Sequence, residues 1–138
     1  MKTKKFLGLL LVLYSLLMIS CSEDQTTAPL TGNAPLTKFS DIKAKVFVNC
    51  IGAQCHSSAG NQGNLVLESG VAYNNLVGVQ SVLFPQYKRV EAGSSANSLI
   101  IKILKGEVSP RMPLDGNFLD AATIDSLAKW IDLGALNN

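Results

Sequence analysis

Apolar residues recur at helical spacing in four stretches of the chain, and the segments between them are rich in Gly, Asn and Pro. The first stretch starts near Ser40 or Asp41, whose side chains suit the positive end of a helix. Ile42, Val46 and Cys50 then follow at intervals of four and share one helix face. The pattern predicts an amphipathic helix that leads directly to Cys50.

Two further stretches predict short helices in the middle of the chain. The first follows Ser69, and its apolar positions are Val71, Ala72, Leu76 and Val77. The second spans residues 97–105, and Gly106 is a natural stop because glycine favours the position just after a helix. Its apolar positions are Leu99, Ile100, Ile103 and Leu104.

The last stretch has the clearest boundaries. Asp120 is a good N-cap, Leu119 before it can pack against Ile124, and Gly134 marks the end. The positions that follow the i, i+3, i+4, i+7 pattern are Ile124, Leu127, Ala128, Ile131 and Ala135. With no confident strand between the helices, we expect an all-α domain of about four short helices with long loops.

The N-terminal segment has the pattern of an export signal. Three lysines precede an almost unbroken apolar run at residues 6–19, and small Ser20 lies directly before Cys21. This order resembles the lipobox of bacterial lipoproteins, in which the signal is removed and the cysteine is lipidated. We therefore expect a signal peptide at residues 1–20 and a membrane anchor on Cys21; an uncleaved membrane anchor and an ordinary signal peptide are the alternatives.

Composition divides the remaining chain into a tether and one domain. Residues 21–38 are rich in Thr, Pro, Gly and Asn without a hydrophobic period, which predicts a flexible tether. Residues 39–138 are long enough for one small domain. Loss of the three signal lysines turns the net charge of +2 into nine bases against ten acids, or −1. No basic block remains, so we expect no nucleic-acid binding.

The segment from Cys50 to His56 carries the candidate chemistry. With Cys21 assigned to the lipid, Cys50 and Cys55 are the remaining cysteines of an exported chain, and His56 follows directly. A c-type haem needs two thiols for its vinyl groups and an adjacent histidine for its iron. Here the cysteines are five residues apart, about 140° of rotation on an ideal helix. The inserted residues must therefore loop out, and Gly52 suits such a turn.

Two alternatives to haem remain open for this segment. Cys50 and Cys55 can form a small disulfide loop followed by an unrelated histidine. A zinc site is the second alternative, but two cysteines and one histidine leave a tetrahedral structural site one ligand short.

Met112 is the candidate for the second axial ligand of a haem iron. His56 is the only histidine, and Met112 is the only methionine outside the signal peptide. Met112 lies between Pro110 and Pro113, and this setting favours an extended loop that presents a thioether over a place in a helix core. A five-coordinate iron, water or a lysine are the competing arrangements.

Several short motifs occur in the order found in one family. They are Asn64-Leu65, Ala72-Tyr73-Asn74-Asn75-Leu76, Arg89-Val90-Glu91-Ala92-Gly93, Ser98-Leu99, Met112-Pro113 and Trp130-Ile131-Asp132-Leu133-Gly134-Ala135. With the haem-type segment, they resemble a small class I-type cytochrome c domain of planctomycete-type cytochromes and related bacterial lipoproteins. The four-residue gap between the cysteines, and Leu114 where a second proline is common, depart from the family pattern.

The resemblance implies a cytochrome c-like fold and one covalently attached haem c. It implies thioether bonds through Cys50 and Cys55, iron ligation by His56 and Met112, and first and last helices that cross at one haem edge. It gives Arg89 a contact with a haem propionate, since guanidinium groups pair well with carboxylates; an ordinary solvated arginine is the alternative. Trp130 is expected in the core or at the haem edge.

Three functions are open at this point. An iron held by histidine and methionine has no free position, which favours electron transfer with redox partner proteins at the periplasmic or outer face of a membrane. The second is a haem-free, disulfide-bonded binding module, and the third is a haem enzyme or sensor with an open sixth position. No catalytic serine–histidine pattern, phosphate-binding glycine loop or acidic metal cluster is present in the sequence, so we expect no enzyme.

Overall fold

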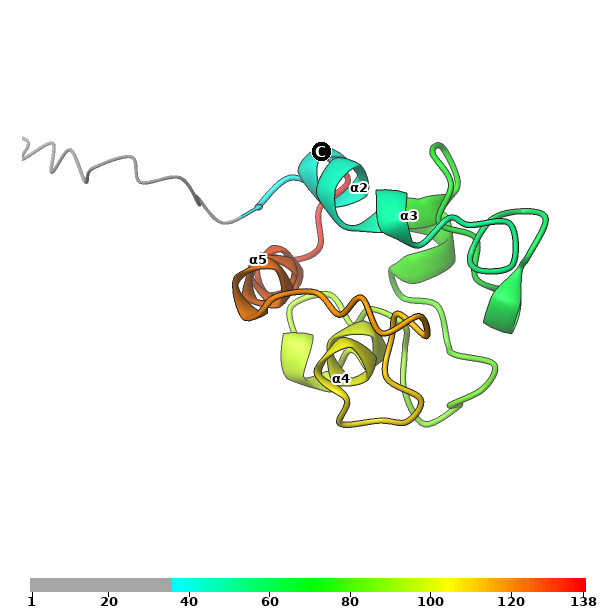
Figure 1. Cartoon of the computed structure of the whole chain (residues 1–138). Helices are drawn as coiled ribbons and strands as arrows, with labels where there is room; N and C mark the ends of the chain where they lie inside the picture. The colour runs from blue at the N-terminus through cyan, green and yellow to red at the C-terminus, as the bar shows by residue number, and fades with distance from the viewer. Residues whose placement is uncertain (1–35) are drawn as a thin grey trace, which may run out of the picture. The chain divides into compact units, whose positions relative to one another are not determined.

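The computed structural model describes residues 36–138, which form helices joined by long loops (Figure 1). The helical elements are α2 (Phe39–Lys45), η1 (Phe47–Asn49), η2 (Gln62–Asn64), α3 (Ala72–Leu76), η3 (Ser95–Asn97), α4 (Leu99–Lys105) and α5 (Ala121–Asp132). In this part of the chain, β-structure is limited to two isolated bridges, between Val77 and Val90 and between Gln80 and Lys88. The expectation of helices with long loops is confirmed.

Helices α4 and α5 begin and end close to their predicted positions, and they lie side by side (Figure 1). Asp120 caps α5 by accepting hydrogen bonds from the amide and the hydroxyl of Thr123, both at 2.8 Å. These bonds lower the pKa of Asp120, because they favour its charged form. Gly106 ends α4 with a φ of 80°, in the left-handed region that favours glycine.

Helix α2 begins at Phe39, one residue before the predicted start, because its cap comes from the far end of the chain. The side chain of Asn138 accepts a hydrogen bond from the Phe39 amide at 2.9 Å. The backbone carbonyl of Asn138 accepts from the Ser40 amide at 2.9 Å. The two free amides at the start of α2 are therefore satisfied by Asn138 and not by a neighbouring side chain.

The core of the domain joins α2 to α5 through aromatic side chains. Phe39 stacks on Trp130 with ring centroids 5.3 Å apart, and it meets Phe47 and Tyr73 edge-on. Trp130 is 1% exposed, and its indole N–H donates to the Leu136 carbonyl at 2.9 Å. The expected place of Trp130 in the core is confirmed. Its contact with Phe39 holds α2 against α5, and α2 is followed along the chain by η1 and then by Cys50.

The expected signal peptide, the lipidated Cys21 and nearly all of the expected tether lie outside the described residues. Leu36, near the end of the expected tether, is half-buried and packs against the core. Within residues 36–138 no helix is long and apolar enough to span a membrane.

Candidate functional site

The candidate haem-binding residues from the sequence line a cavity of about 510 Å³. Its walls come from the α2–η1 segment, the loop after Cys50, α3, α4 and the proline-rich loop after α4. Most of the lining side chains are leucine, isoleucine, valine, phenylalanine or proline. Among the remaining ones are Cys50, Cys55, His56, Arg89 and Met112. Residues as far apart in the sequence as Val46 and Leu114 therefore face one apolar space.

The cysteine segment leaves the helical turn and loops out, as the spacing predicted. Cys50 directly follows η1, and the His56 amide returns to donate to the Cys50 carbonyl at 3.0 Å. Inside this loop the Cys55 amide donates to the Gly52 carbonyl at 2.9 Å. Both cysteines and the histidine can therefore line one cavity despite the wide spacing.

The expected role of Gly52 in this turn is wrong, and Gly60 has the steric role instead. Gly52 is outside the left-handed region, and a Cβ atom built on it meets only the Cys55 sulfur, at an ordinary 3.5 Å. A Cβ atom on Gly60 would lie 2.6 Å from the Cys55 carbonyl oxygen and 2.7 Å from the Cys55 nitrogen. Only glycine fits where the chain passes this close to its own backbone. The sequence reasoning missed Gly60, since its contact partner is set by the loop's path.

The two thiols lie in different surroundings. Both are free, with Cys55 exposed and Cys50 half-buried, and the Cys50 Sγ donates to the Val46 carbonyl at 3.6 Å. Burial, together with smaller contributions from the nearby Cys55 and Asp115, raises the pKa of Cys50 to about 11. The Cys50 thiol is therefore the less reactive of the two on chemical grounds.

We expect the reduced, haem-free protein to be alkylated by iodoacetamide at Cys55 long before Cys50 at pH 8. A rise in pKa from 9.0 to about 11 leaves Cys50 with about 100-fold less thiolate than an ordinary cysteine. The difference should shrink toward pH 11, where Cys50 ionises. Peptide mass spectrometry over time measures both rates, with the protein in urea as the control. Equal rates in the folded protein at pH 8 would contradict the described burial of Cys50.

His56 is oriented by a backbone carbonyl. Its Nδ1 lies 3.1 Å from the carbonyl oxygen of Gln62. A carbonyl only accepts hydrogen bonds, so Nδ1 carries the proton when the ring is neutral, and Nε2 keeps a free lone pair. The loop is tied further by the Gln62 amide, which donates to the Cys55 carbonyl at 3.2 Å. His56 thus presents one nitrogen that can bind a metal.

Met112 lies in the loop that follows α4, as the flanking prolines predicted. It is half-buried, and its amide donates to the Ile103 carbonyl at 3.3 Å. Pro110 and Pro113 line the same cavity on either side of it. The loop therefore holds a thioether at the wall of the cavity that His56 also lines.

Arg89 is buried, and this rules out the alternative of an ordinary solvated arginine. It is 6% exposed, and its guanidinium donates to the carbonyls of Asn75 at 2.7 Å, Gly63 at 2.9 Å and Asn64 at 3.0 Å. Burial lowers the pKa of Arg89, and the three hydrogen bonds offset the loss of water. Arg89 lines the cavity, yet the contacts it makes are with backbone.

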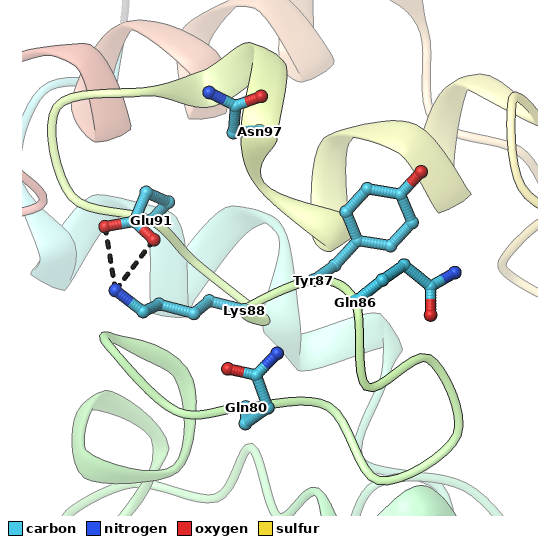
Figure 2. Close-up of a pocket in the computed structure, with 6 residues that line it drawn as sticks. All are labelled: Gln80, Gln86, Tyr87, Lys88, Glu91 and Asn97. Atoms are coloured by element: carbon cyan, nitrogen blue, oxygen red, sulfur yellow. Dashed lines mark hydrogen bonds and ion pairs between the residues drawn. The ribbon is translucent and has the colours of Figure 1, made fainter.

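A second hollow, of about 360 Å³, is polar (Figure 2). Its charged side chains, Lys88 and Glu91, pair with each other at 2.8 Å. The other side chains around it are Gln80, Gln86, Tyr87 and Asn97. It contains none of the sequence-predicted site residues, so the apolar cavity is the candidate site.

Within the described part of the chain, no three His, Cys, Asp or Glu side chains come together as a direct metal site. Comparison of the chain with protein-family models, curated proteins and solved structures finds no match.

Proposed function

We propose that the domain holds one covalently attached haem c in the apolar cavity and acts as an electron carrier. The observation that carries the proposal is that Cys50, Cys55, His56 and Met112 all line this one cavity. Cys50 and Cys55 would form the thioether bonds, and His56 and Met112 would be the axial ligands of the iron. These are the roles that the sequence resemblance implies.

The residues present fit such a group. Cofactor pockets commonly measure about 300–1,000 Å³ and combine apolar walls with a few polar groups, and the cavity of about 510 Å³ agrees with both. His56 offers Nε2 because the Gln62 carbonyl takes the Nδ1 proton. The two thiols and the Met112 thioether, which line the same cavity, complete the set of donors that a haem of this type requires.

The chain's own part in the proposed function is to position the side chains that would bind the haem and to exclude water from it. The bound haem would supply one-electron redox chemistry. With His56 and Met112 both bound, the iron would have no open position for a substrate, so the proposed role is electron transfer and not catalysis. Apolar walls around the site favour the less charged state of a redox centre by keeping water away. The proposed partners are redox proteins that reach the exposed Cys55 side of the cavity.

The N-terminal part of the proposal concerns location. A lipid on Cys21 would tether the domain to a membrane at the periplasmic or outer surface. A flexible link of this kind raises the effective concentration of a carrier near membrane-bound partners.

The full chain, expressed in a bacterial host with a haem-attachment system, tests the proposal. Mass spectrometry of the membrane extract should show a chain that begins at a lipidated Cys21 and is heavier by one haem. The reduced protein should show the sharp α-band of a c-type haem. A chain without haem and with Cys50 linked to Cys55 would overturn the proposal in favour of the disulfide-bonded module.

Replacement of Met112 by alanine should abolish the ferric methionine–iron charge-transfer band while covalent haem is retained. Met112 supplies the only thioether outside the expected signal peptide, and its loss should also lower the reduction potential. Leu133→Ala is the control, because Leu133 is an exposed side chain that does not line the cavity. If the unmodified protein never shows the band and instead binds a small ligand at the iron, the carrier role is wrong and the sensor role gains support.

A further inference from the structure

The turn that orients His56 has an unusual backbone. It consists of η2 with the residue before it, and three of its residues have positive φ: Asn61 at 44°, Gly63 at 63° and Asn64 at 54°. This left-handed region is uncommon for residues other than glycine, so a turn with two asparagines in it needs support from its surroundings. The first residue of η2 is Gln62, whose carbonyl accepts the His56 hydrogen bond.

The support comes from one buried side chain. Arg89 reaches η2 across 25 and 26 residues of sequence and donates through one terminal nitrogen to the carbonyls of Gly63 and Asn64. Its other terminal nitrogen donates to the Asn75 carbonyl in α3. A planar guanidinium can hold two backbone segments at a fixed separation in this way, and lysine lacks the geometry to do so.

We propose that Arg89 is a positioning residue for His56. By holding the Gly63 and Asn64 carbonyls, it fixes η2 against α3 and keeps the Gln62 carbonyl in line with the His56 Nδ1. The histidine proton then stays on Nδ1, and Nε2 remains the nitrogen available to a metal. The inference deepens the proposed function, since it rests on that function for the role of Nε2. It differs from the propionate contact that the resemblance implies, because the three hydrogen bonds of Arg89 run to backbone carbonyls and not to a carboxylate.

The haem-free protein gives a direct test, because His56 is the only histidine and its ring nitrogens give unambiguous ¹⁵N resonances. At a pH where titration in the same sample shows a neutral ring, the unmodified protein should have its proton on Nδ1. Arg89→Met should move the proton population toward Nε2, which is seen as opposite shifts of the two nitrogens. Lys88→Met is the matched control: Lys88 pairs with Glu91 (Figure 2) and makes no hydrogen bond to η2, so the wild-type tautomer should persist.

Arg89→Lys keeps the test decisive if Arg89→Met does not fold. A lysine retains the charge but cannot reach all three carbonyls together, so the tautomer should shift in the same direction by a smaller amount. A folded Arg89 variant with the wild-type tautomer would overturn the proposal. If that same variant changed only the haem-loaded protein, Arg89 would act on the cofactor as the resemblance implies. Failure of the unmodified chain to attach haem would count against the proposed function alone, since the tautomer is measured without haem.

Discussion

Replacement of Gly60 by alanine is expected to abolish the proposed covalent attachment of haem and to lower the free energy of unfolding by about 1–3 kcal/mol. The added Cβ atom would lie 2.6 Å from the Cys55 carbonyl oxygen and 2.7 Å from the Cys55 nitrogen. Both atoms belong to the backbone, so no side-chain rotation relieves the overlap. The backbone of Cys55 must move, and the adjacent His56 must move with it.

Gly52→Ala is the matched control within the same loop. Its Cβ atom meets an ordinary contact, and its φ is not in the left-handed region, so attachment and stability should stay close to those of the unmodified protein. Mass spectrometry measures the attached haem, and urea unfolding measures the free energy. Full haem loading of Gly60→Ala, or loss of haem from Gly52→Ala, would show that the described path of the loop is wrong.

Features decided by near neighbours in the sequence were predicted correctly. The N-cap of α5 at Asp120 and the stop of α4 at Gly106 depend on residues within one helical turn. The looping-out of the cysteine segment followed from the rotation per residue in a helix, and its cause is equally local. The position of Met112 in a loop followed from two flanking prolines.

Features decided by distant partners were not predicted. The cap of α2 comes from Asn138, 99 residues away from Phe39, and no local pattern marks it. For Arg89 the sequence left a propionate contact and an ordinary solvated arginine open, and neither predicted its hydrogen bonds to carbonyls 14 to 26 residues earlier. Every residue has a backbone carbonyl, so the sequence does not show which carbonyls a distant side chain will bind. The sequence therefore predicted which residues line the site better than it predicted what holds them there.

The buried core and the cavity share residues, so the proposed function depends on the packing of the core as well as on the cavity. Val46 and Phe47 belong to the buried core, and they also line the cavity just before Cys50. Phe47 meets Phe39, which stacks on Trp130. A change at Trp130 therefore acts on the site through two aromatic contacts and without touching the cavity itself.

Replacement of Trp130 by alanine is expected to lower the free energy of unfolding by about 3–5 kcal/mol, the largest loss for any single substitution considered for this domain. The indole is 1% exposed, stacks on Phe39 at 5.3 Å and donates to the Leu136 carbonyl. Its removal leaves a cavity and an unpaired carbonyl.

Because Trp130 is the only tryptophan, urea unfolding is followed by circular dichroism and not by fluorescence. Phe118→Ala, at a ring that is 46% exposed, is the control and should cost about 1 kcal/mol or less. Similar losses for the two variants would mean that Trp130 does not join α2 to α5 in solution, and the cysteine segment would then lack its described support.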